Sequence, residues 1–552
     1  MDDSFQKRMF VAFLISSVFI LISYYFMPKN QYLSQEDKAV NTEQIKEEKN
    51  EFIRELTFYT NGIIQTNRIY DKTILVEIDT YGGRILDLYV DGKWNQTKKP
   101  IRLYWQENPY LTGDLFFGSL ENISEIKERP FYRVVKQESN LILLEAVLKY
   151  KDRKIIINKK YEISGDYQLN YEVTVKNADS KEINIDIGGN SLSVAFSYGF
   201  SSVKEKNPQN MLYADYFDRK PRKVLKGGLF RKRETLFSIH SPKWFSVHNN
   251  YFIAITKPDF TNFNTKFLLV REEKLYSEIV CGIEMPALSL MPGEEKTFKV
   301  NLYVGPKNEE LLGKIDKTYK KLFAWPVAFN WFMKPMEKGL YYLAHFIATL
   351  VKNWGITIIL LALIIKLLLS PLSIQAAVSI KKSNLLQPKL KKLQEKYRDD
   401  QQMLNQKIAE LYKKEKVNPL GGCLPILLQF PVFFVLYRVL STSVELKGAG
   451  FLWIKDLTMP DTLFKTNLPF LSTFNLLPII MTLVQIFQMK IQSMRTPGTA
   501  KEQQMINTYL LPVFFLFIFW NMPSGLVLYW TVQNLFSIVE QEIINLDKQI
   551  KV

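Results

Sequence analysis

The run Asn353 to Leu372, NWGITIILLALIIKLLLSPL, is long enough to enter a bilayer and carries a single charged residue, Lys366. No acidic residue occurs in the run to pair with it. An ionisable side chain at bilayer depth is costly, and it usually faces a bundle interior or a water-filled cavity. A lysine near a helix end can instead extend its ammonium group to the membrane surface. Lys366 is therefore either a binding group for an anionic partner or a lysine that reaches the inner surface.

Uncharged polar side chains also occur in later apolar segments. The residues concerned are Gln429, Gln485, Gln488, Gln533 and Asn534. Such side chains can line a hydrated cavity, or they can hydrogen-bond across neighbouring helices and hold a bundle together. The sequence leaves both interpretations open.

Residues that support covalent chemistry are sparse. The three histidines, His240, His248 and His345, show no metal-ligand spacing, and no nucleotide-binding glycine loop is present. We therefore expect no enzyme activity, no catalytic residue, no cofactor and no metal site. The alternative is a membrane-tethered sugar-binding or sugar-active domain, because His240 and His248 would share a face if SIHSPKWFSVHNN were one continuous strand.

The composition averages two kinds of region. The 552 residues are 47% hydrophobic and 23% charged, with a formal net charge of +17. This mixture suits neither a pure membrane bundle nor an average soluble enzyme, and a second domain is expected at this length. Cys281 and Cys423 lie far apart, so no disulfide framework is indicated. The many lysines and arginines within residues 51–305 are interpreted as solvated surface, so no nucleic-acid recognition is expected.

The N-terminal segment 1–28 predicts an uncleaved transmembrane anchor. Residues 9–27 carry no charge, follow a Lys-Arg pair, and can cross most of a hydrocarbon core of about 30 Å. A cleaved signal peptide would end at a small-residue site, whereas this run ends in YYFMP. The positive flank predicts a cytoplasmic N-terminus. Residues 29–50 are polar and charged and predict a flexible linker.

Residues 51–305 predict a large exported β-sandwich. Short β-branched and aromatic runs such as RILDLYVDG, KIIINKKYEIS and YQLNYEVTVKNAD alternate apolar and polar positions, as strands with one buried face do. Gly-Gly at 82–83, Asp-Gly at 91–92 and Gly-Gly at 227–228 supply turn residues.

The C-terminal half predicts an interfacial helix followed by a five-helix core. Residues 306–353 are expected to form a linker and an amphipathic helix in the outer interface, where tryptophan and tyrosine settle. The core is expected within 354–544, and residues 545–552 form a short cytoplasmic tail. The five predicted spans are Trp354–Ser370, Leu424–Leu440, Leu476–Gln488, Thr508–Trp520 and Pro523–Ile538. Their prolines and glutamines suit a bundle that thins the membrane or encloses a wet cavity.

The loop after the first of these spans orients the bundle. Residues 381–416 contain eleven Lys/Arg against five Asp/Glu, and short loops rich in Lys/Arg remain in the cytoplasm. Counting from an inside N-terminus, six spans put both termini in the cytoplasm and the β domain outside.

Residues 375–418 predict a cytoplasmic helical hairpin that breaks near Asp399-Asp400. Its predicted apolar stripes are Leu385, Leu390, Leu393 and Tyr397 on one helix, and Met403, Ile408, Leu411 and Tyr412 on the other. Its basic residues are candidates for client recruitment and for attraction to anionic phospholipids. They are Lys381, Lys382, Lys389, Lys391 and Lys392.

Three segments resemble the signature sequences of the YidC family of membrane protein insertases. They are NWG followed by Lys366 and SPL, NPLGGCLPILLQFPVFFVLY at 418–437, and NMPSGLVLYW at 521–530. YVGPK at 303–307 and the order of anchor, exported domain and five-span core are similar to the same family, so the resemblance covers the whole chain.

The resemblance implies a bacterial inner-membrane protein with six transmembrane helices, a periplasmic β-supersandwich, and a hydrophilic groove open to cytoplasm and lipid. The family carries a basic residue, commonly arginine, in the groove at the position of Lys366. Lysine offers a compact ammonium charge there, whereas arginine would offer a planar guanidinium group. Gln429 and Trp530 match motif positions best, and Gln485 and Gln533 are further groove candidates. The implied partners are nascent membrane proteins, the Sec translocon and the ribosome. A secondary transporter is the rival, but no repeated hydropathy supports it.

Overall fold

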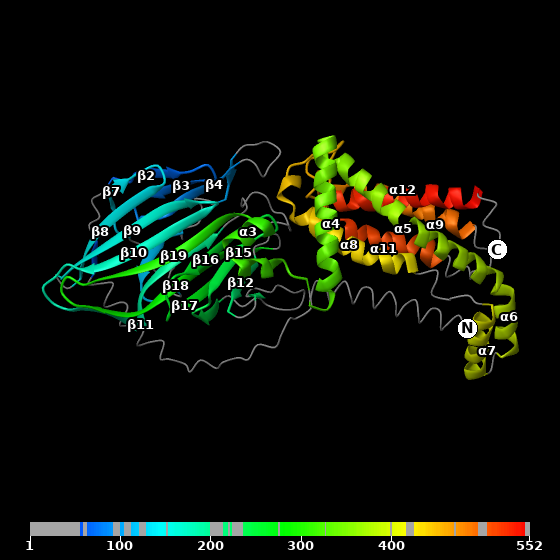
Figure 1. Cartoon of the computed structure of the whole chain (residues 1–552), viewed down its shortest axis with the longest axis horizontal. Coiled ribbons are helices and arrows are strands. Elements are labelled where there is room, and N and C mark those ends of the chain that lie inside the picture. Colours follow the sequence, from blue (N-terminus) through cyan, green and yellow to red (C-terminus); the bar gives the residue numbers. More distant parts are fainter. Residues whose placement is uncertain are drawn as a thin grey trace. The chain divides into compact units, whose positions relative to one another are not determined.

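The protein is represented by a computed structural model that divides into two compact units between Ala324 and Trp325 (Figure 1). The residues that it describes are 56–58, 63–91, 100–103, 112–120, 129–150, 153–198, 213–218, 221–223, 236–273, 276–325, 327–397, 400–415, 424–468, 471–494 and 505–546. The predicted anchor 1–28, the linker 29–50 and most of the tail 545–552 lie outside these residues. Each unit is considered by itself.

The β unit contains three antiparallel sheets among its described residues. Its ten-stranded sheet runs in the order β1 (Leu56–Phe58), β8 (Leu141–Tyr150), β9 (Arg153–Gly165), β10 (Gln168–Asn177), β19 (Glu295–Pro306), β16 (Phe252–Pro258), β15 (Trp244–His248), β12 (Tyr213–Phe217) and β13 (Pro221–Lys223), with β7 (Arg133–Gln137) paired to β8. The five-stranded sheet is β14 (Leu236–His240), β17 (Asn264–Glu273), β18 (Tyr276–Leu290), β11 (Ile183–Tyr198) and β6 (Asp114–Phe117). The four-stranded sheet is β2 (Thr66–Tyr70), β3 (Ile74–Asp79), β4 (Ile85–Val90) and β5 (Ile101–Arg102).

The alternating sequence pattern explains how these strands pack. Every second residue of β10 is buried from Leu169 to Asn177, and β9 alternates in the same way. Because successive side chains of a strand point to opposite faces, one face of each strand enters the core. The predicted β-rich domain is therefore confirmed.

The β unit extends further along the chain than the sequence predicted. Helix α3 (Glu309–Ile315) and the 3-10 helix η4 (Lys317–Phe323) fall within it. Leu312 and Tyr319 are buried, and the Trp244 Nε1–H donates to Thr318 Oγ1 at 2.9 Å. The β unit therefore continues past residue 305, because two short helices, each with a buried apolar residue, complete its core.

The helical unit contains the predicted helices with slightly different ends. Its long helices are α4 (Val327–Val351), α5 (Trp354–Leu385), α8 (Leu424–Thr442), α9 (Leu476–Met494), α11 (Leu511–Phe519) and α12 (Ser524–Leu546). A short 3-10 helix η5 (Val444–Leu446) and a hairpin of β20 (Thr462–Leu468) and β21 (Leu471–Asn475) connect α8 to α9, and a π-helical turn η6 (Ile506–Leu510) precedes α11. Within the described ranges, the stretch Trp354–Ala376 is the one long and apolar enough to cross a membrane by length and composition, and the apolar helices at Leu476–Gln492 and Thr508–Phe519 are shorter.

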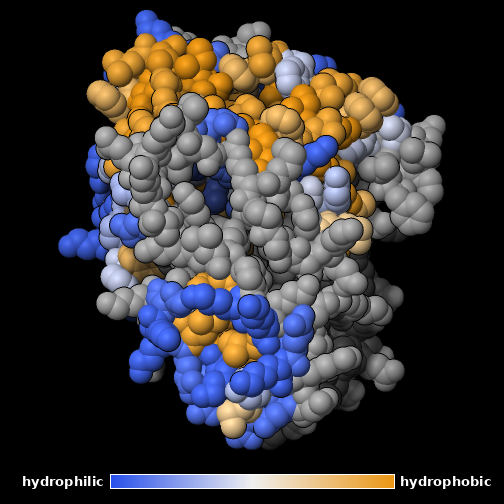
Figure 2. Space-filling model, turned by 90° about the vertical axis from the view of Figure 1, so that its right-hand side faces the viewer, coloured by the Kyte–Doolittle hydropathy of each residue, from blue (hydrophilic) through white to orange (hydrophobic). Residues whose placement is uncertain are grey.

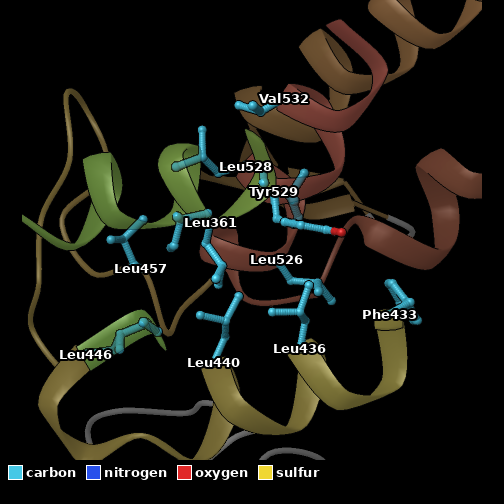
Figure 3. Close-up of a cluster of buried hydrophobic side chains, with 14 of the residues drawn as sticks. Leu361, Phe433, Leu436, Leu440, Leu446, Leu457, Leu526, Leu528, Tyr529 and Val532 are labelled. Atoms are coloured by element: carbon cyan, nitrogen blue, oxygen red, sulfur yellow. The ribbon is translucent and has the colours of Figure 1, made fainter. Parts of the chain in front are cut away.

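Side chains from all six of these helices contribute to the core of the unit. Leu361 of α5, Leu436 of α8 and Leu526 of α12 are each at most 1% exposed and point toward one another (Figure 3). Two glycines allow the loop after α8 to approach: a Cβ on Gly355 would lie 2.1 Å from the Phe451 ring, and one on Gly525 would lie 3.0 Å from the Leu457 carbonyl oxygen. The NWG and PSG motifs therefore have a packing role.

The hairpin consists of α6 (Gln387–Lys396) and α7 (Gln401–Lys414). Its apolar cluster has Leu386, Leu390, Leu404 and Ile408 buried, with Leu393, Tyr397, Leu411 and Tyr412 packed against them. Met403 is 38% exposed, so its assignment to the stripe is wrong. Asp400 caps α7 by accepting from the Met403 N–H at 2.9 Å. Leu404 takes the inward position instead, because it lies four residues before the buried Ile408 and so shares its helix face. In the lower part of Figure 2, hydrophilic side chains (blue) surround an apolar centre (orange), and a broad apolar surface lies in the upper part of the view.

Candidate functional site

Lys366 lies inside α5 and reaches a neighbouring helix. Its Nζ donates to Ser537 Oγ at 2.8 Å and lies 2.7 Å from Glu540 Oε2, both on α12. The Lys366 and Glu540 side chains are each 15% exposed. The acidic partner that the apolar run lacks is therefore supplied by the last helix of the chain, and the ammonium group ends between helices.

Helices α5 and α12 run parallel in a fixed register. The Gln533 Nε2–H donates to the Ala362 carbonyl at 2.8 Å, and this pair has the same sequence separation of 171 residues as Lys366 and Ser537. A constant separation over one turn requires both helices to run in the same direction. Ser537 Oγ also donates to the Gln533 carbonyl at 2.8 Å. The Gln533 side chain therefore forms a hydrogen bond between two helices, which is one of the two roles that the sequence left open for it.

Several buried polar atoms near this register have no hydrogen-bond partner among the described residues. Gln485 is 3% exposed and Asn534 is 9% exposed. The atoms concerned are Gln485 Oε1, Gln488 Oε1, Trp530 Nε1, Asn534 Nδ2 and Glu540 Oε1. Because a buried polar atom without a partner costs about 1–3 kcal/mol, such groups are normally satisfied by protein, water or a ligand. They belong to α9 and α12.

Trp530, one of the two best motif matches, lies in an aromatic cluster. The Trp530 ring centroid is 5.4 Å from those of Phe433 and Phe519, and 5.8 Å from that of Phe515. Only the indole N–H is available for a polar contact, since the ring itself is packed. Gln429 is half-buried one helical turn before Phe433 on α8, which places both on one face of that helix.

The hairpin lysines occupy the end of α5 and helix α6. Lys389 is exposed and its Nζ pairs with Glu415 Oε1 at 2.5 Å, which ties α6 to the end of α7. Lys392 is also exposed. The side chains of Lys381, Lys382 and Lys391 lie outside the described residues.

Sequence reasoning missed Ser537 and Glu540. The apolar run of Lys366 contains no acidic residue, and the partner lies far along the chain. A signal was available: Gln533, Ser537 and Glu540 are spaced by four and three residues and so form one polar stripe on an otherwise apolar helix. That stripe faces α5.

The histidines of the β unit do not converge. His240 ends β14 and His248 ends β15, strands of two different sheets, so the single continuous strand that the sugar-active alternative requires is not formed. His248 is buried, with its Nε2 2.9 Å from Asp215 Oδ2 and its Nδ1 2.9 Å from Lys307 Nζ. Burial and the Lys307 charge lower the pKa of His248 despite Asp215. The exposed His240 instead contacts Asn264 at 3.1 Å.

The β-rich unit is joined to a set of apolar helices, one of them long and apolar enough to cross a membrane, and this arrangement fits a membrane protein with a large domain outside the membrane. Two family profiles match: the 60Kd inner membrane protein over residues 346–551 and the YidC periplasmic domain over 67–338. The chain is 31% identical over 511 residues to the membrane protein insertase YidC of Blochmanniella floridana, covering 87% of this chain and 88% of that one. It is 28% identical to the YidC of Rickettsia rickettsii strain Iowa, covering 97% and 98%. The chain belongs to the YidC family of membrane protein insertases.

The chain is also similar to solved structures. A crystal structure of an active YidC insertase is 19% identical and covers 88% of this chain and 93% of that one, with a TM-score of 0.34. A galactose mutarotase related enzyme from Lactobacillus acidophilus is 11% identical and covers 44% of this chain and 97% of that one, with a TM-score of 0.32. The family assignment rests on the profiles and on the sequence relatives: the protein is a membrane protein insertase of the inner membrane with a periplasmic β domain, and not an enzyme.

Proposed function

We propose that the polar region between α5, α9 and α12 is a hydrated groove that receives the polar tail of a nascent membrane protein. One observation carries this proposal: buried polar atoms of Gln485, Asn534 and Glu540 have no hydrogen-bond partner among the described residues, and Glu540 pairs with Lys366 of the apolar helix α5. Water in such a recess satisfies these atoms, and it lowers the cost of bringing a short polar tail partway into the membrane.

The groove acts by electrostatics and solvation, without covalent chemistry. Lys366 attracts acidic residues of the tail, because opposite charges interact more strongly in a medium less polar than water. The apolar segment of the client then moves into lipid along α8 and α11. Leu510, Phe514 and Phe517, on or directly before α11, are 59%, 36% and 72% exposed, which supports a lipid-facing surface there.

The proposed topology has six spans with both termini in the cytoplasm. Helices α5 and α12 are expected to run from outside to inside, and their parallel register supports this arrangement. We place α4 in the outer interface, with Trp331 and Tyr342, which are 76% and 53% exposed, at headgroup level. The opposite face of α4, with Ala344 and Ile347, is buried against the core.

The proposed partners follow from the charges of the cytoplasmic side. The exposed Lys389 and Lys392 of the hairpin would attract anionic phospholipids, each basic residue near such a surface contributing about 1 kcal/mol. Nascent membrane proteins are the clients, and cooperation with the Sec translocon and contact with the ribosome are further parts of the proposal.

The test is protease-protected insertion of a small single-span protein with an acidic N-terminal tail into liposomes that contain only this purified protein. We expect insertion above that of empty liposomes. Equal insertion with a correctly folded sample would reject the groove as a self-sufficient insertion site.

A further inference from the structure

We propose that Glu540 is an internal competitor for Lys366. The Glu540 carboxylate pairs with the Lys366 ammonium group until an acidic residue of a client tail replaces it. The strength of this internal ion pair thereby sets how strongly the insertase prefers acidic tails over neutral ones. This inference rests on the proposed function, and it concerns a residue that neither the motifs nor the apolar run of Lys366 indicates.

The geometry of the pair shows what a client must displace. Glu540 Oε2 lies 2.7 Å from Lys366 Nζ, the contact that a client carboxylate would make. Because the two unit charges cancel, Lys366 presents a dipole and not a net charge to the rest of the groove. An incoming acidic residue gains its full ion pair only when the Glu540 contact opens.

The bond between Glu540 and Lys366 is suited to exchange. Glu540 Oε1 is buried without a hydrogen-bond partner among the described residues, so only one of the two carboxylate oxygens is paired. A buried ion pair with such an unsatisfied oxygen recovers little of its desolvation cost. Both side chains keep 15% exposure, which leaves an approach for water and for a client.

Ser537 keeps Lys366 in place during the exchange. Its hydroxyl accepts from Lys366 Nζ at 2.8 Å while donating to the Gln533 carbonyl at 2.8 Å. An ammonium group has three donors, so one can remain on Ser537 while another changes from Glu540 to a client carboxylate. The lysine therefore stays inside the bundle whether or not a client is bound.

The experiment compares two clients that differ only in tail charge. Both are single-span proteins, one with two aspartates in the N-terminal tail and the other with two asparagines in their place. Each is inserted into zwitterionic liposomes that contain the wild type or the Glu540→Gln variant. The measured quantity is the ratio of protease-protected acidic client to protease-protected neutral client. Glutamine preserves the shape of the side chain and removes its charge.

We expect Glu540→Gln to raise this ratio by about two- to fivefold, the size of one partly solvated ion pair. Glu542→Gln is the matched control, because it removes the same charge two residues away at an exposed position, and it should leave the ratio unchanged. An unchanged or lower ratio in Glu540→Gln, with wild-type insertion intact, would overturn this inference and leave the proposed function standing. A wild type that inserts neither client would reject the proposed function and this inference together.

A double variant separates competition from a loss of structure. If Glu540 acts through Lys366, then adding Glu540→Gln to Lys366→Gln should not change the ratio further. If the pair only holds α5 to α12, Glu540→Gln should lower insertion of both clients by the same factor, and the inference would be wrong.

Discussion

Lys159 in the β unit and Lys366 in the helical unit show two ways of burying an ammonium group. Lys159, on β9, is 0% exposed, and its Nζ donates to the carbonyls of Gly82 at 2.6 Å and Gly113 at 2.7 Å. The ammonium group also lies 4.8 Å from the Tyr132 ring centroid. Lys366 is partly exposed and is held by two side chains, Ser537 and Glu540.

The difference lies in the partners. Backbone carbonyls are fixed by the turns that present them, and Gly82 and Gly113 adopt φ of +87° and +85°, which glycine tolerates best. A Cβ on Gly113 would lie 2.1 Å from the Tyr161 hydroxyl. Side-chain partners such as Glu540 can rotate away. Lys159 is therefore suited to hold strands together, whereas Lys366 is suited to exchange one partner for another.

The largest expected effect is the loss of the β unit's buried lysine. Lys159→Met should destabilise the β unit by about 3 kcal/mol, because two buried carbonyls lose their donor. Lys160→Met is the matched control, since the neighbouring side chain is part-exposed and pairs with Glu162 at 2.6 Å. Hydrogen exchange of β9 and β10 in the full-length protein measures the change. Equal protection in both variants would show that the carbonyls find other donors.

The same lysine predicts a pH dependence. Burial lowers the pKa of Lys159 to about 7, although Asp114 and Asp79 oppose the shift. Between pH 7 and the ordinary lysine pKa of about 10.4, the unfolded state binds the proton that the folded state has lost, so stability rises with pH by up to about 1.4 kcal/mol per unit. Wild type should gain exchange protection over Lys159→Met between pH 7 and 9, after correction for intrinsic exchange. A constant difference would show that Lys159 keeps its proton.

A smaller and more selective effect is expected at Lys366. Lys366→Gln should lower insertion of the acidic-tailed client by about threefold relative to the neutral-tailed one, because one partly solvated charge pair is lost. Lys366→Arg should retain the preference, since the charge remains. The two-client liposome assay measures both variants. A fall of equal size for both clients would assign Lys366 a structural role like that of Lys159.

The smallest effect is expected at Gln533. Gln533→Leu removes the hydrogen bond to the Ala362 carbonyl, and such bonds between membrane helices average about 0.6 kcal/mol. We expect slightly faster hydrogen exchange in α12 and an unchanged ratio of acidic to neutral client. A changed ratio would mean that Gln533 contacts the client and is more than a bridge between helices.

Much of the architecture could be predicted locally. The alternation in β9 and β10 and the apolar runs of α5, α8, α9 and α12 gave element types and approximate ends. Boundaries that depend on packing were less predictable: α3 and η4 belong to the β unit through residues such as Leu312 and Tyr319. Leu404 takes the inward position in place of Met403 because it lies four residues before Ile408, on the same face of α7.

The sequence by itself determined that this chain has an exported β-rich domain, a set of apolar helices, and an isolated lysine among them, because periodicity and hydropathy are local properties. Its motifs also identified the family. Only the tertiary structure decided what the lysines contact. The Gly82 and Gly113 carbonyls around Lys159, and Glu540 beside Lys366, come from distant parts of the chain, and nothing local to either lysine specifies which strand or helix will pack against it.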